Sequence, residues 1–132
     1  MRVVIFCHSL ISDWNHGNAN ILRGIASELI TRDCSLRVYE PADAWSLTNL
    51  IAGYGQVAVR RFHEAYPRLH SIQYDPATLD IDAALDGADL VLVHEWNDPA
   101  IVRHIGRHRL RSWGYTLLFT TRTTARLPSP RA

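Results

Sequence analysis

The chain has 132 residues, of which 47% are hydrophobic and 20% are charged, and its net charge is +1. A chain of this length buries roughly two-thirds of its unfolded surface, so we expect one domain that needs no disulfide. The near-neutral charge argues against a nucleic-acid partner, and no apolar run approaches the ~18 residues of a membrane span. The two cysteines are expected as free thiols, which predicts a cytoplasmic protein without a transmembrane segment.

The first thirty residues carry the most regular pattern in the chain. Residues 3–8 form an apolar run that predicts a strand, residues 9–18 a polar loop, and residues 19–32 an amphipathic helix, which Asn18 or Asn20 would cap. Arg23 is expected on the solvent side of this helix. A strand that leads through a polar loop into a helix is typical of an open parallel α/β sheet, whose ligands bind beyond the carboxyl ends of the strands.

Helix and strand patterns alternate through the middle of the chain. Residues 35–39 predict a second strand that Pro41 ends, and Asp43 is a candidate cap for a helix that reaches residue 52. Gly55 separates that helix from a second helical segment at residues 56–66. Residues 71–74 predict a short third strand, and residues 81–85 predict one helical turn.

The next segment predicts a central strand and a long helix. Residues 88–94 are nearly all apolar, as expected for a strand that is buried on both faces. Asp98 followed by Pro99 is a helix start, with Leu110 expected on the inner face of that helix. Its solvent face would carry arginines at every fourth position, namely Arg103, Arg107 and Arg111. Residues 115–119 predict a fifth strand.

This order of elements predicts an α/β fold: a single, doubly wound, Rossmann-like parallel sheet with strands in the order 3-2-1-4-5. In that order the first and fourth strands are neighbours, and the winding reverses between them. His8 and His94 would then close two adjacent strands at the switch point, where ligands bind in such folds. We expect the loops after these strands to form two walls of one crevice.

Other sites are less well supported by the residues. His104 and His108 have the spacing of a two-histidine metal face but lack an evident third ligand, so no metal site is expected. A dinucleotide-binding loop needs three close glycines, and this loop holds only Gly17. Cys7 and His8 are adjacent strand residues that point to opposite faces, which argues against a cysteine nucleophile. P-loop and nucleophile-elbow motifs are also missing.

Several runs of this sequence resemble the N-terminal half of a GT-B glycosyltransferase, nearest to the bacterial glycosyltransferase-like proteins of the spore-maturation type. The resemblance covers residues 1–119, and its more specific parts are the tryptophan-bearing runs. The runs that carry it are 1–8 (MRVVIFCH), 14–18 (WNHGN), 22–29 (LRGIASEL), 36–41 (LRVYEP), 43–50 (DAWSLTNL) and 93–99 (VHEWNDP).

The resemblance implies a two-domain enzyme in which this domain holds the acceptor and a C-terminal domain, missing here, holds the nucleotide-sugar donor. The donor is a co-substrate, so no cofactor is implied. His94 or His16 would accept the proton of the acceptor hydroxyl. The implied substrate-binding residues are His8, Trp14, Gly17, Asn18, Glu95 and Trp96. Gly17 and Asn18 would open a helix whose N-terminus favours a phosphate, and the tryptophans would stack on sugars.

Two other functions remain open at this point: a stand-alone nucleotide- or sugar-binding module, and an NAD(P)-type oxidoreductase domain. Under the preferred interpretation, the 132-residue chain alone should not transfer sugar, because one domain supplies only one wall of the cleft.

Residues 120–132 differ from the rest of the chain, since they contain no acid, no aromatic residue and one large aliphatic, Leu127. We expect them to be disordered. The resemblance implies that the chain would continue here with a His-Asp-Thr-His-His run. One GC-rich choice of codons for residues 119–125 would encode Phe-His-Asp-Thr-His-His-Gly after one C is inserted behind the Phe119 codon. Our hypothesis is therefore that the tail is an out-of-frame reading and the chain a truncated copy.

Overall fold

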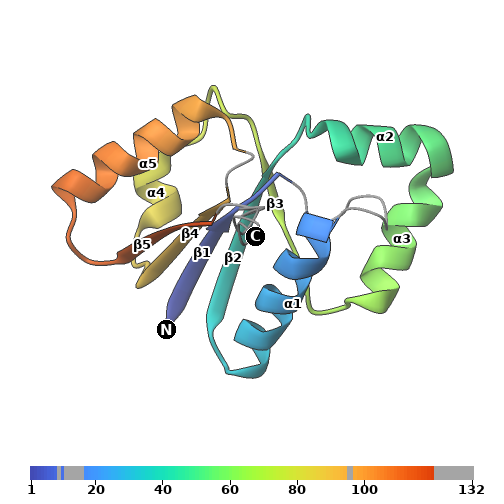
Figure 1. The fold of residues 1–132 in the computed structure, drawn as a ribbon, viewed down its shortest axis with the longest axis horizontal. Helices are drawn as coiled ribbons and strands as arrows, with labels where there is room; N and C mark the ends of the chain where they lie inside the picture. Colours follow the sequence, from blue (N-terminus) through green and yellow to red (C-terminus); the bar gives the residue numbers. More distant parts are fainter. Residues whose placement is uncertain (9, 11–16, 95–96, 121–132) are drawn as a thin grey trace, which may run out of the picture.

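The computed structural model describes residues 1–8, 10, 17–94 and 97–120. A five-stranded parallel sheet has the order β3-β2-β1-β4-β5, which confirms the predicted α/β fold and its strand order (Figure 1). Its strands are β1 (Arg2–Phe6), β2 (Ser35–Pro41), β3 (Ile72–Tyr74), β4 (Leu90–His94) and β5 (Thr116–Thr120).

Helices cover both faces of the sheet. On one side lie α1 (Gly17–Thr31), α2 (Trp45–Tyr54) and α3 (Gln56–Ala65), and on the other lie α4 (Ile81–Leu85) and α5 (Pro99–Arg111) (Figure 1). None of the described helices is both long and apolar enough to cross a membrane.

Two apolar layers hold the sheet between its helices. Alternate residues of the central strand β1 point to opposite layers, so Val3 and Ile5 pack with α1 and α3, whereas Val4 and Phe6 pack with α4 and α5. All four side chains are at most 1% exposed. This explains why a central parallel strand has a continuous apolar sequence rather than an alternating one.

The caps of three helices test the sequence predictions. Asp98 accepts a hydrogen bond from the Ala100 N–H at 2.8 Å and precedes Pro99, which confirms the predicted start of α5. The prediction for α2 is wrong: Ala44, not Asp43, precedes the helix, and it forms no side-chain cap. Helix α1 begins at Gly17, so Asn18 and Asn20 lie within it and do not precede it.

Other boundaries and exposures also differ from the predictions. Strand β1 ends at Phe6, two residues before His8, and β5 continues to Thr120, one residue past the expected domain boundary. Arg23 is buried and Leu110 is 79% exposed, each the reverse of the prediction. Residues 121–132, for which we expected disorder, lie outside the described residues.

Candidate functional site

The candidate site lies at the carboxyl ends of β1 and β4. These strands are paired through Phe6 and Val93, and the chain winds in opposite directions on the two sides of this pair. The switch point therefore falls where the sequence predicted it. His94 is the last residue of β4 and is 8% exposed, while the half-buried His8 follows β1 by two residues.

Asn97 joins the ends of the two strands. Its Nδ2 donates hydrogen bonds to the carbonyl oxygens of Phe6, at 3.0 Å, and His94, at 2.5 Å. The Asn97 side chain is buried, and its Oδ1 has no hydrogen-bond partner among the described residues. A buried acceptor without a partner calls for a water or a ligand hydroxyl that donates to it. The sequence analysis assigned Asn97 no role.

The loop after β1 is anchored at Leu10. Its N–H donates to Glu40 Oε2 at 2.9 Å, and its carbonyl oxygen accepts from Arg23 Nε at 2.7 Å. Glu40 is fully buried and also accepts from Ser71 Oγ at 2.6 Å. Both carboxylate oxygens of Glu40 thus accept hydrogen bonds within the fold, and the buried side chain is not available to bind a ligand such as a ribose hydroxyl.

The Arg23 guanidinium is stable in this buried position because it packs against two aromatic rings, one in α3 and one in the C-cap residue of α3. The Arg23 Cζ lies 5.1 Å from the ring centroid of Phe62 and 5.7 Å from that of Tyr66. Burial lowers the pKa of Arg23, and Tyr66 partly opposes this effect. Cation–π contact and the hydrogen bond to Leu10 thus compensate for the desolvation of the charge.

Tyr74 ends β3 at the same edge of the sheet and is 5% exposed. Its ring packs edge-on against Phe6 and Tyr39, each at a centroid distance of 6.2 Å. The hydroxyl is buried without a hydrogen-bond partner in the described part of the chain. Burial raises the pKa of Tyr74, and nearby Cys7, Asp98 and Asp43 raise it further, so at neutral pH the hydroxyl is a potential donor to a ligand.

Cys7 is not a nucleophile in this arrangement. The thiol is fully buried in the layer that faces α1, and burial together with the nearby Glu40 raises its pKa well above the usual value. A protonated, inaccessible thiol does not attack a substrate. Both Cys7 and Cys34 are free thiols, as predicted.

Several predicted site residues cannot be placed. Trp14, His16, Glu95 and Trp96 lie outside the described residues, as do the side chains of residues 17–20. The backbone of α1 does begin at Gly17, directly after the loop, so this helix N-terminus follows the β1 loop. Helix N-termini of this kind favour phosphates and other anions.

The two histidines of α5 have separate environments. His108 Nδ1 lies 2.9 Å from the Tyr115 hydroxyl, and its Nε2 lies 3.5 Å from Asp82 Oδ1. His104 is exposed. No group of three or more His, Cys, Asp or Glu residues suited to a metal ion occurs in the part of the chain that is described.

The described edge therefore combines two histidines and a buried amide oxygen near the switch point of the sheet with a buried phenol at the end of β3. These groups accept and donate hydrogen bonds, and imidazole can also take up a proton at neutral pH. Comparison of the chain with models of protein families, with curated proteins and with solved structures finds no match.

Proposed function

We propose that this chain carries the acceptor-side N-terminal domain of a GT-B glycosyltransferase, which moves a sugar from a nucleotide-sugar donor to an acceptor hydroxyl. The observation that carries the proposal is the adjacency of β1 and β4, whose carboxyl ends lie side by side at one switch point. The sequence resemblance supports the substrate class, and the fold supports the location of the site.

Within this proposal the histidines perform the proton chemistry. His94 or His16 takes the proton of the acceptor hydroxyl as that oxygen attacks the anomeric carbon of the donor. His8, Trp14, Glu95 and Trp96 bind the acceptor sugar by hydrogen bonds and stacking. Gly17 and Asn18 present the N-terminus of α1 to the leaving diphosphate, where a helix dipole stabilises the developing charge.

Asn97 and Tyr74 extend this list of acceptor-binding residues. The Asn97 Oδ1 accepts a hydrogen bond from an acceptor hydroxyl, and the Tyr74 hydroxyl donates to an acceptor oxygen. Both atoms are buried and lack partners in the described residues, so a polar ligand would recover hydrogen bonds that the fold leaves unmade. Both also lie near carboxyl ends of parallel strands.

A thermal-shift screen tests the proposal against the oxidoreductase alternative. The purified chain is heated with nucleotide sugars, with free monosaccharides and with NAD(P), each at saturating concentration. We expect sugars to stabilise the chain, since a ligand at ten times its Kd raises stability by about 1.4 kcal/mol, or roughly 5 °C in Tm. We expect NAD(P) to leave Tm unchanged.

A variant pair locates the binding. His94→Gln should lose the sugar-dependent shift, whereas His63→Gln, an exposed change on α3, should keep it. Stabilisation by NAD(P) alone would favour an oxidoreductase domain and refute the proposal. So would the failure of every sugar and nucleotide sugar to raise Tm.

A further inference from the structure

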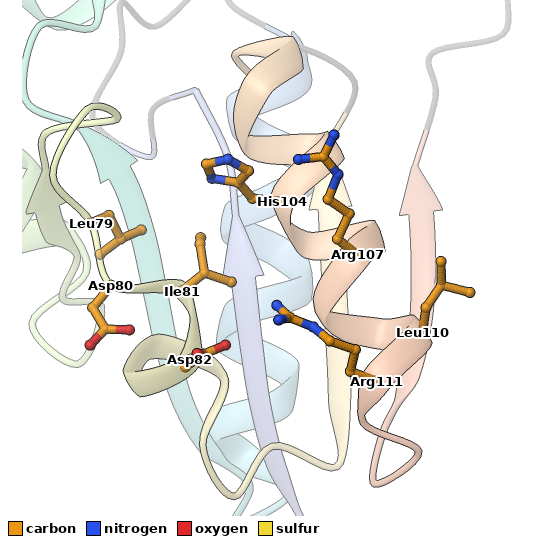
Figure 2. A pocket seen from close by; sticks show the side chains of 8 residues that line it. All are labelled: Leu79, Asp80, Ile81, Asp82, His104, Arg107, Leu110 and Arg111. Carbon is orange, nitrogen blue, oxygen red and sulfur yellow. The ribbon is translucent and has the colours of Figure 1, made fainter.

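A charged groove runs between α4 and α5, on the outer side of this helical layer. Its volume is about 660 Å³, which lies within the usual range for small-molecule sites. Figure 2 shows two walls of opposite sign. One wall carries Asp80, Ile81 and Asp82, and the other carries His104, Arg107 and Arg111 from α5.

The acidic wall is already engaged within the fold. Asp80 Oδ1 accepts from the Ala83 N–H at 3.1 Å as the cap of α4. Asp82 Oδ1 lies 3.5 Å from His108 Nε2, and His108 is held in turn by its 2.9 Å contact with the Tyr115 hydroxyl. The cap bond holds the Asp80 carboxylate in place, whereas the Asp82 side chain is 75% exposed.

The two arginines of the basic wall differ from the carboxylates in this respect. Within the described residues, neither Arg107 nor Arg111 has a hydrogen bond or an ion pair, whereas their neighbour Arg109 donates to the Ser112 carbonyl at 3.3 Å and lies over the Trp113 ring. Arg107 and Arg111 are one turn apart, so their guanidinium groups can approach the same anion. Guanidinium groups match the oxygens of a phosphate in geometry and charge.

We propose that this groove binds a small organic phosphate ester that also carries hydroxyl groups. The phosphate lies on Arg107 and Arg111, and the hydroxyls donate to Asp80 and Asp82 on the opposite wall. The carboxylates disfavour a second anionic group at their end of the groove, which selects a ligand with one charged and one neutral polar end. This site is separate from the strand-end site of the proposed function and does not depend on it.

Binding is measured by calorimetry at constant ionic strength with four probes: a hexose 6-phosphate, the same hexose without phosphate, adenosine monophosphate and inorganic phosphate. We expect the hexose phosphate to bind more tightly than inorganic phosphate, and the free hexose not to bind. Adenosine monophosphate separates a nucleotide from a sugar phosphate as the source of the ester.

Variants test each wall. Arg107→Gln with Arg111→Gln should weaken hexose-phosphate binding at least tenfold, whereas Arg103→Gln, one turn earlier on α5 and outside the groove lining, should change it less than twofold. Asp80→Asn keeps the helix cap, because asparagine caps as well as aspartate. It should weaken hexose-phosphate binding while leaving inorganic phosphate binding equal or stronger.

Three outcomes would overturn the proposal. One is an equal affinity of the parent chain and the double glutamine variant. Another is an equal loss with Arg103→Gln, which would indicate unspecific attraction to a basic surface. The third is a self-association in sedimentation that the double variant abolishes, because the groove would then be an interface between copies. If the glutamine pair fails to fold, the matching lysine pair keeps the charge and should still lose affinity.

Discussion

Glu40 accepts a hydrogen bond from the backbone N–H of Leu10 at 2.9 Å, so the end of β2 holds the loop that follows β1. Arg23 on α1 holds the carbonyl of the same residue. Leu10, in the loop that follows β1, is thus tied to the sheet on one side and to a helix on the other. Both ties are buried, where an unmade hydrogen bond is costly.

We predict that Glu40→Ala lowers the free energy of unfolding by about 2–4 kcal/mol, because it leaves the Leu10 N–H and the Ser71 hydroxyl without their acceptor. Urea denaturation followed by circular dichroism measures the loss. Glu28→Gln is the matched control, since its ion pair with Arg32 is exposed and worth less than about 1 kcal/mol. Equal losses in the two variants would show that the anchor is unimportant.

Asn97→Asp should destabilise the chain by about 2–4 kcal/mol. The change removes the donor to the Phe6 and His94 carbonyl oxygens and places a carboxylate beside them in a buried position. Chemical denaturation is again the measurement, with Asn49→Asp on the exposed side of α2 as the control. A loss no larger than that of the control would argue against the role of Asn97 as the link between the strands.

Tyr74→Phe should stabilise the chain without ligand by about 1 kcal/mol, or roughly 4 °C in Tm. The variant keeps the ring contacts with Phe6 and Tyr39 but removes a buried hydroxyl that has no partner in the described residues. Differential scanning calorimetry measures the shift. Tyr54→Phe, at an exposed position, should leave Tm unchanged. A lower Tm for Tyr74→Phe would mean that the hydroxyl is hydrogen-bonded.

Stability should fall at alkaline pH. Burial raises the pKa of both Cys7 and Tyr74, so the folded state keeps their protons after the unfolded state has released them. The contribution is fully present below the unfolded pKa values, about 8.5 for cysteine and about 10 for tyrosine, and declines above them by up to ~1.4 kcal/mol per pH unit for each group.

Urea unfolding at pH 7.5, 8.5, 10 and 10.5 measures this decline. Cys7→Ala should flatten it between pH 8.5 and 10, and Tyr74→Phe should reduce it above pH 10. A stability that stays constant from pH 8.5 to 10.5 would contradict the assignment of these two groups.

Local patterns were sufficient to predict the elements and the topology of this fold. The apolar run that contains β4 marked a central strand, and Asp98 with Pro99 marked the start of α5. The strand order then followed from right-handed crossovers between parallel strands, which also placed the carboxyl ends of β1 and β4 side by side. These features depend on neighbouring residues and on chain handedness, so a single sequence contains them.

The sequence alone thus determined an α/β sheet in the order 3-2-1-4-5 and the edge at which folds of this kind bind their ligands. Only the tertiary structure decided the roles of Arg23, Glu40 and Asn97, whose hydrogen-bond partners lie 13, 30 and 91 positions away. The helical pattern predicted that Arg23 faces solvent, because such a pattern assigns each residue to a face only by its polarity and its position in the turn. The helical pattern contains no information about partners from other parts of the chain. Folding brings a loop carbonyl and aromatic rings to the buried face of the helix, and these partners stabilise the charge of Arg23 there.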